Sequence, residues 1–233
     1  MEEAASLYSR LEHQISDWDL DDFDVQIEAS RFYYHYAVAL RTLQRLGEAR
    51  VRLERALELN SSHLPSLREI GPVYVQEKEW EKAERVFRQL LQLFGGSGNT
   101  DELGETYSYL GEVELALGKE DKARKRFAKA LELKKENIRA LRGMGRLLYQ
   151  NEDWKKLLDV YNQVLFNAPD PEAILEAYLV KGHVLDAKLG LTDNAAEHYR
   201  KAHHFQENLV QEDNGSNAVQ RLSSLCTLRL AEL

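Results

Sequence analysis

Three arginines at helical spacing are the residues of this sequence best suited to bind a ligand. Arg139, Arg142 and Arg146 recur at i, i+3 and i+7, which places all three on one face of a helix. A guanidinium group can hold a carboxylate through two parallel hydrogen bonds. Such a face could therefore bind the acidic side chains of an extended ligand, and Tyr109 and Tyr149 would flank it.

A second interpretation of the three arginines leaves no ligand site. Their guanidinium groups could pair with Glu105, Glu112 or Glu176 on neighbouring helices, or remain solvated. Charged side chains are common at protein surfaces, and an exposed ion pair contributes only about 0 to 1 kcal/mol. Both interpretations stay open at the level of the sequence.

A metal or catalytic site finds less support. His183 and Asp186 lie one helical turn apart, and three further histidines follow them, at His198, His203 and His204. Nothing in the sequence supplies the ligand spacing or the supporting hydrogen bonds of a metal site. No phosphate-binding glycine loop, nucleophile elbow or zinc-protease helix occurs either. We therefore expect no cofactor, no metal and no enzymatic activity.

The composition favours a folded helical protein. Hydrophobic residues make up 43% of the 233 residues and charged residues 30%, with only four prolines. No apolar run is long enough to span a membrane, and the acidic opening differs from a secretory signal, so we expect a cytoplasmic protein. The single cysteine, Cys226, excludes an internal disulfide. A net charge of -8 argues against a nucleic-acid partner.

The negative charge is concentrated at the start of the chain. Residues 1–24 hold eight acids and one base, whereas residues 25–233 hold 31 acids and 30 bases. The stretch DWDLDDFD at 17–24 could be a docking peptide for another protein. Acids also stabilise helix N-termini, and Phe23 and Ile27 lead into an apolar pattern, so we favour a structural role for this stretch.

The helices that would position these residues repeat along the chain at an interval close to 34 residues. In the clearest copy, residues 104–137, small and bulky residues stand at fixed positions, namely Tyr107, Leu110, Gly111, Ala123, Phe127 and Ala130. Small residues let one helix approach another closely, while bulky residues fill the remaining volume. The pattern predicts two helices that face each other in each copy.

Five copies share this spacing, and they predict repeats at 30–63, 64–97, 104–137, 138–171 and 175–208. The fifth copy carries one inserted residue before Ala195. Glu114 and Lys181 are exceptions, because they stand at positions that are apolar in the pattern. The segment GGSGNT at 95–100 predicts a longer loop, and Pro72 predicts a bend in its helix.

Helix starts agree with this repeat phase. Asp170 followed by Pro171 is typical of a helix N-cap with proline at the first helical position. Asp153 and Thr192 suit the caps of second helices. These residues therefore place helix boundaries where the repeats require them.

The repeated positions resemble the tetratricopeptide repeat family over roughly residues 30–208. The resemblance implies an all-α fold, an α-solenoid of antiparallel helix pairs wound as a right-handed superhelix, and a role in binding proteins. The end repeats of a solenoid need covering. An apolar pattern within residues 1–29, and a second one at 212–233, predict capping helices at both ends.

The resemblance also implies that the first helices of the repeats line a concave groove. The candidate groove residues are Tyr34, His35, Arg68, Tyr109, Arg139, Arg142, Arg146, Tyr149 and His183. Co-chaperones of this family hold the terminal carboxylate of a heat-shock protein with lysine, asparagine and arginine at fixed positions. Three of those positions hold Tyr34, Val38 and Glu69 here, so we do not expect a chaperone tail as the ligand.

The predicted function is a scaffold or adaptor that binds a peptide segment or a folded partner, which the arginines suggest is acidic. The main alternative is a module that associates with itself within a larger assembly, as a homo-oligomer. A helical enzyme domain is the less favoured alternative, because it would need a pocket with converging titratable groups.

Overall fold

The computed structural model describes residues 2–15, 18–94, 99–168 and 170–211. Helices account for nearly all of these residues and no strand occurs among them, which confirms the predicted all-α fold. The predicted C-terminal capping helix at 212–233 lies outside the described residues. In the part of the chain that is described, no helix combines the length and the apolar character needed to cross a membrane.

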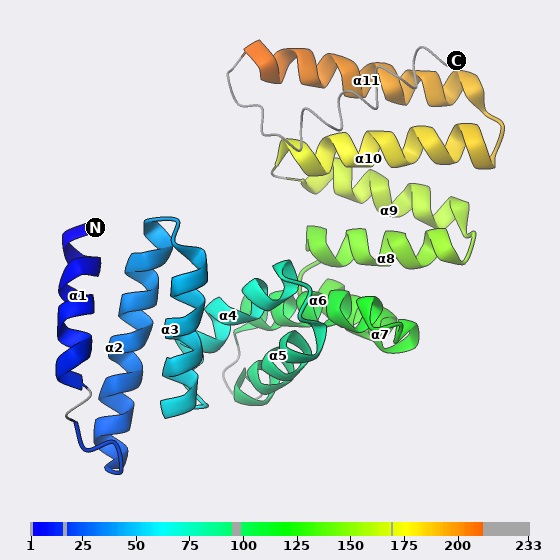
Figure 1. Ribbon diagram of the computed structural model, residues 1–233. Coiled ribbons are helices and arrows are strands. Elements are labelled where there is room, and N and C mark those ends of the chain that lie inside the picture. The colour runs from blue at the N-terminus through cyan, green and yellow to red at the C-terminus, as the bar shows by residue number, and fades with distance from the viewer. Residues whose placement is uncertain (1, 16–17, 95–98, 169, 212–233) are drawn as a thin grey trace. The chain divides into compact units, whose positions relative to one another are not determined.

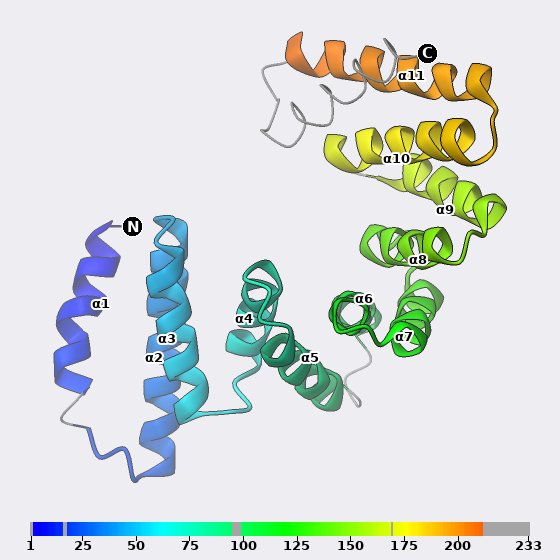
Figure 2. The ribbon, with the colours of Figure 1, turned by 45° about the vertical axis from the view of Figure 1, so that its right-hand side comes forward.

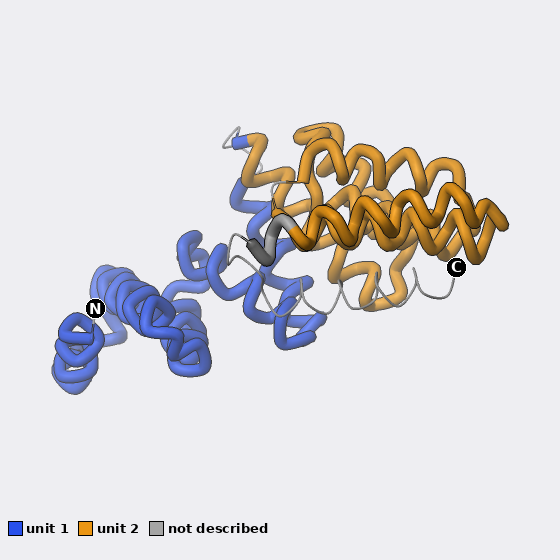
Figure 3. Tube along the Cα trace, turned by 90° about the horizontal axis from the view of Figure 1, so that it is seen from above, with its two compact units in different colours: residues 1–99 blue, residues 100–233 orange. Residues whose placement is uncertain are grey.

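The chain divides into two compact units, residues 1–99 and residues 100–233 (Figure 3). The boundary falls within the segment GGSGNT. Unit 1 contains α1 (Glu2–Ile15), α2 (Phe23–Thr42), α3 (Leu46–Leu59), α4 (Leu64–Gln76) and α5 (Trp80–Phe94). Unit 2 contains α6 (Thr100–Ala116), α7 (Glu120–Leu133), α8 (Ile138–Gln150), α9 (Trp154–Asn167), α10 (Pro171–His183), the π-helix η1 (Val184–Lys188) and α11 (Thr192–Gln211).

Within each unit, consecutive helices pair as antiparallel hairpins (Figure 1). The pairs are α2 with α3 and α4 with α5 in unit 1, and α6 with α7, α8 with α9 and α10 with α11 in unit 2. In unit 2, α8, α9, α10 and α11 follow one another as stacked layers (Figure 2). Each hairpin overlaps one predicted repeat, although α2, α6 and α10 begin before the predicted starts at residues 30, 104 and 175.

A glycine packed against an aromatic ring recurs between the two helices of these hairpins. A Cβ atom at Gly71 would lie 2.8 Å from Phe87, one at Gly111 would lie 2.6 Å from Phe127, and one at Gly182 would lie 2.5 Å from Tyr199. All three rings are almost fully buried. The spacing of small and bulky residues in the sequence therefore corresponds to close contact between helices.

Each hairpin turn contains one residue with left-handed backbone. Among the described residues, positive φ angles occur at Gln44 (60°), Lys78 (60°), Gly118 (72°), Glu152 (56°) and Gly190 (66°). The first four occupy the fifteenth position of their repeats, and Gly190 occupies the sixteenth because of the inserted residue. The five-residue π-helix η1 lies just before Gly190 and accommodates the additional residue.

The two polar exceptions to the apolar pattern are buried with partners. Glu114 is fully buried, and its carboxylate accepts a hydrogen bond from Arg126 Nε at 3.3 Å. Lys181 is 8% exposed, and its ammonium donates to Asn162 Oδ1 at 2.5 Å. Desolvation by burial, reinforced by the charge of Lys201, lowers the pKa of Lys181.

The start of the first hairpin differs from the repeat phase. Helix α2 begins at Phe23, seven residues before the predicted repeat, because the Asp22 carboxylate caps it by accepting from the backbone N–H of Asp24. The acidic stretch thus supplies a helix N-terminus, as its structural interpretation predicts. The Thr192 hydroxyl does not cap α11. Thr192 is itself the first residue of that helix, and its hydroxyl donates to Asp186 at 3.3 Å.

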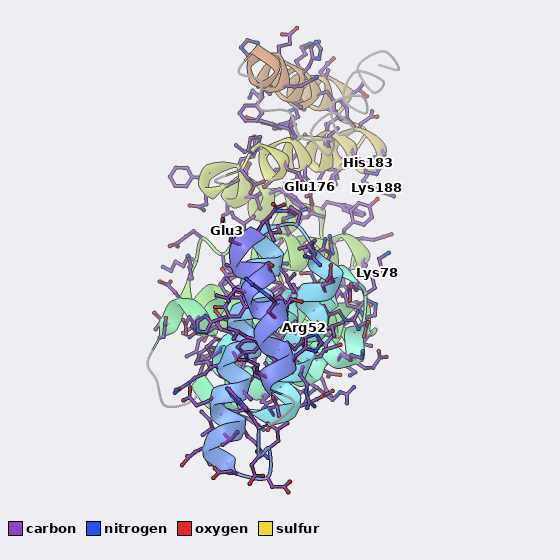
Figure 4. The ribbon with its side chains drawn as sticks, turned by 60° about the vertical axis from the view of Figure 1, so that its left-hand side comes forward. Glu3, Arg52, Lys78, Glu176, His183 and Lys188 are labelled. Atoms are coloured by element: carbon purple, nitrogen blue, oxygen red, sulfur yellow. The ribbon has the colours of Figure 1, made fainter. Side chains whose placement is uncertain are left out.

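Helix α1 packs on the first hairpin through aromatic and charged contacts. The Tyr8 ring stacks on the Tyr36 ring with centroids 5.6 Å apart. The Arg52 guanidinium donates to Glu12 at 2.9 Å and lies over the Tyr36 ring at 5.1 Å, and Figure 4 shows Arg52 beside α1. These contacts cover an apolar face of α2 and α3.

Candidate functional site

Helix α8 presents the three arginines and Tyr149 on one face. The Asn137 side chain caps the helix by accepting from the Ala140 N–H at 2.9 Å. Leu141 and Leu148 are buried on the opposite side, in the core shared with α9. We call the face formed by Arg139, Arg142, Arg146 and Tyr149 the α8 stripe.

The N-terminal end of the α8 stripe is joined to α6. The Arg139 guanidinium donates to Glu112 at 2.6 Å and lies 3.7 Å from the centroid of the Tyr109 ring. Burial raises the pKa of the Tyr109 phenol, while the charge of Arg139 opposes this rise. The structure thus brings Tyr109 and Arg139 together and leaves Arg139 engaged within the chain.

Two other members of the α8 stripe are joined to α10. Arg142 forms an ion pair with Glu176, and the Tyr149 hydroxyl lies 3.2 Å from His183 Nε2. Glu176 and His183 are both marked in Figure 4. For Arg139 and Arg142 the structure therefore has the pairing that the second interpretation of the arginines describes.

Arg146 differs from its two neighbours on the stripe. Its side chain is exposed, and it makes no ion pair with any residue that the structure describes. A ligand carboxylate could bind Arg146 without breaking an existing ion pair. The electrostatics of the stripe therefore single out Arg146 as its available cation.

A cavity of about 480 Å³ lies beside the α8 stripe. Arg139, Arg142 and Arg146 line it together with Gly143 and Phe127. Its other polar and charged lining residues are Glu105, Glu112, Lys134, Glu136, Asn137, Asn167 and Asp170. The cavity is thus polar and of mixed charge, with an apolar part at Gly143 and Phe127.

The candidate residues of unit 1 lie on α2 and α4. The Tyr34 ring packs edge-on against the rings of His35 and His63, with centroids 5.2 and 5.4 Å apart. His63 Nδ1 lies 2.8 Å from Ser66 Oγ, and burial lowers the pKa of the imidazole. These rings therefore contact one another and other groups of the same unit.

Arg68 lies over the Phe94 ring, 5.3 Å from its centroid. It also lines a second cavity, of about 620 Å³, which lies among α2, α3 and α4. Arg41 and Glu69 form an ion pair in the wall of this cavity, and Pro72 and Val73 give it an apolar part. Unit 1 thus has its own hollow surface.

Three residues that lie at or beside the α8 stripe were not among the groove residues predicted from the sequence. Gly143 lies against Phe127. Trp154 packs on Tyr149 with ring centroids 5.3 Å apart, and Lys188 lies near the Tyr149 and Trp154 rings. Trp154 is partly buried and packs against the core shared by α8 and α9. The small residue at 143 was the one signal in the sequence, since it stands within the arginine run.

Metal-binding residues do not gather in the described ranges. No group of three or more histidine, cysteine, aspartate or glutamate side chains in those ranges could hold a metal ion. His183 instead contacts Tyr149, and Asp186 accepts from Thr192.

Stacked antiparallel hairpins, each joined by a tight turn and closed by small residues against large ones, define an α-solenoid protein. The sequence profile of the tetratricopeptide repeat matches residues 30–63 and, separately, residues 62–136. Residues 30–136 therefore carry tetratricopeptide repeats, and the helical hairpins that follow them share the same fold. No functionally curated protein matches the sequence.

Solved structures share the fold. The crystal structure of MamA is 19% identical, with 79% of this chain and 95% of that chain covered and a TM-score of 0.61. PilF of Pseudomonas aeruginosa is 18% identical, with 96% and 98% covered and a TM-score of 0.59. YrrB, described as a TPR protein with an unusual peptide-binding site, is 25% identical, with 81% and 94% covered and a TM-score of 0.55. The family and these folds support a protein-interaction scaffold in general.

Proposed function

We propose that this protein is a non-enzymatic scaffold that binds an acidic segment of a partner protein along the α8 stripe. In this proposal Arg146 is the residue that forms an ion pair with a carboxylate of that segment. The peptide-binding site named for YrrB supports a peptide as the kind of ligand. A cytoplasmic location and the absence of nucleic-acid and membrane partners remain predictions from the sequence.

The observation that carries the proposal is the difference between Arg146 and the other two arginines. Arg139 and Arg142 are held by Glu112 and Glu176, so their guanidinium groups are fixed in place along α8. Arg146 continues the same face, and its guanidinium has no ion-pair partner among the residues that the structure describes. Charge complementarity of this kind selects acidic partners and speeds their association.

The test uses a fluorescently labelled hexaglutamate peptide as a generic acidic probe, with a hexalysine peptide as the comparison. Fluorescence anisotropy should show binding of hexaglutamate that weakens as salt rises, because the attraction is screened over about 8 to 10 Å at physiological ionic strength. Arg146→Glu should weaken this binding at least about tenfold, which corresponds to about 1.4 kcal/mol.

The matched control is Lys125→Glu, which makes the same charge change at an exposed position on α7. It should change the affinity much less than Arg146→Glu. Arg142→Glu should instead lower the free energy of unfolding, because it would place a carboxylate against Glu176. Equal affinities of the Arg146 and Lys125 variants, with both folded by circular dichroism, would reject the proposal.

Self-association is the second candidate function, as a module within a larger assembly. Light scattering over a range of concentrations separates it from a monomeric scaffold. A mass that rises with concentration and is insensitive to Arg146→Glu would favour self-association through another surface.

A further inference from the structure

Three rings meet at the end of the α8 stripe. The Tyr149 and Trp154 rings are 5.3 Å apart with planes at 75°, and the His183 ring stacks on Tyr149 at 6.2 Å with planes at 22°. Tyr149 is 37% exposed. We call Tyr149, Trp154 and His183 the aromatic corner.

A cation of the same chain already lies on the aromatic corner. Lys188 Nζ is 5.8 Å from the centroid of Tyr149 and 5.7 Å from that of Trp154. Figure 4 marks Lys188 and His183 on neighbouring turns of the chain. Both distances are within the range of about 6 Å over which an aromatic ring attracts an ammonium group.

No carboxylate neutralises this ammonium group in the part of the chain that the structure describes. Lys188 makes no ion pair there, and the nearest acid in sequence, Asp186, accepts a hydrogen bond from Thr192. Lys188 is exposed and is the last residue of the π-helix η1, so its four-carbon side chain lies at the surface. A side chain of this kind can leave the rings at little cost.

We infer that the aromatic corner is a binding site for a cationic side chain, lysine or arginine, of a partner protein, and that Lys188 occupies it in the free chain. The inference goes beyond the proposed function, because it concerns a ligand charge opposite to the one that Arg146 binds. Tyr149 follows Arg146 by three residues, about 4.5 Å along the helix axis. The favoured partner segment therefore carries an acidic and a basic side chain close together.

Lys188 competes with a partner cation for the aromatic corner. A partner cation must displace the ammonium group of Lys188, so the free chain weakens its own site. Removing the side chain of Lys188 should strengthen cation binding, whereas removing a ring should weaken it. A surface lysine that merely rests on two rings predicts no such gain.

The test uses Nα-acetyl-lysine methylamide as the probe, at constant ionic strength, and follows the indole N–H signals of the three tryptophans by NMR. The Trp154 signal, assigned with Trp154→Phe, should shift to saturation while the signals of Trp18 and Trp80 stay in place. In Lys188→Ala the half-saturating concentration should fall about twofold to fivefold. In Tyr149→Leu it should rise by a similar factor.

Arg146→Ala separates this inference from the proposed function, because that change should weaken hexaglutamate binding without weakening the binding of the lysine probe. Nα-acetyl-glycine methylamide, which carries no cation, is the control probe and should shift none of the signals. The inference is overturned if the Trp154 signal does not respond specifically to the lysine probe. It is also overturned if Lys188→Ala binds the probe no better than the natural sequence does.

Discussion

Gly143 of α8 lies directly against the ring of Phe127 on α7, so closely that no side chain fits. A Cβ atom at residue 143 would lie 2.2 Å from Phe127 Cζ. Gly111 of α6 confines the same ring, since a Cβ there would lie 2.6 Å from it. The ring is fully buried and cannot move away from one helix without moving into the other.

Gly143→Ala should therefore lower the free energy of unfolding by about 1 to 3 kcal/mol through overpacking. Gly47→Ala is the matched control, because a Cβ at Gly47 meets nothing within 4 Å. It should leave stability unchanged or raise it by up to about 1 kcal/mol, as alanine is the better helix former. Chemical denaturation that finds the two variants equally stable would show that the ring has room to move.

The hairpin turns allow a prediction of the opposite sign. Lys78 and Glu152 have positive φ, a conformation that costs a residue with a Cβ about 1 to 2 kcal/mol. Lys78→Gly and Glu152→Gly should each raise the free energy of unfolding by up to about 1 kcal/mol, since the flexibility of glycine in the unfolded chain offsets part of the gain.

Gly118→Ala, at the equivalent turn, should lower stability by about 1 kcal/mol. Lys125→Gly serves as the control within a helix and should also be destabilising, by about 1 kcal/mol. Denaturant titration of the four variants checks these signs. A loss of stability in both Lys78→Gly and Glu152→Gly would mean that the left-handed backbone is not strained at these two residues.

His198 predicts a loss of stability in mild acid. Burial, helped by the positive charges of Lys181 and Lys201 and opposed by Glu197, lowers the pKa of His198 to about 4. Protonation therefore favours the unfolded chain, in which the pKa is about 6.5. The resulting loss of stability should develop as the pH falls from about 6.5 to 4 and become constant below that.

His198→Gln should remove this part of the pH dependence. His204→Gln, at an exposed position on the same helix, should retain it. Thermal unfolding at pH 7 and at pH 4.5 provides the comparison, because the loss between these two values should be smaller for the His198 variant only. Equal losses in the two variants would argue against a partly buried, neutral imidazole at His198.

The repeat spacing predicted the fold because each small residue has one large partner at a fixed distance along the chain. Phe127 follows Gly111 by 16 residues, as Phe87 follows Gly71, and these pairs form the contacts between helices. Such contacts are local in sequence. Their geometry follows from helix periodicity and from the constant length of the turn between the two helices.

The state of the arginines could not be predicted in the same way. Arg139 pairs with Glu112 across 27 residues and Arg142 pairs with Glu176 across 34, and each pairing depends on how neighbouring hairpins stack. The sequence offered those acids as partners but could not say that Arg146 would have no ion pair within the described ranges. The early start of α2 also followed from a local hydrogen bond of Asp22, which the repeat pattern does not contain.

The π-helix η1 shows how this solenoid tolerates a change in repeat length. Tyr199 follows Gly182 by 17 residues, one more than in the other pairs, yet the two make the same close contact. The widened turn takes up the extra residue before the chain reverses, so the second helix enters the core with its register intact. An insertion is thereby confined to a single turn, which places the exposed Lys188 at the end of the π-helix, so a change in length can alter the exposed surface while the contact between Gly182 and Tyr199 is kept.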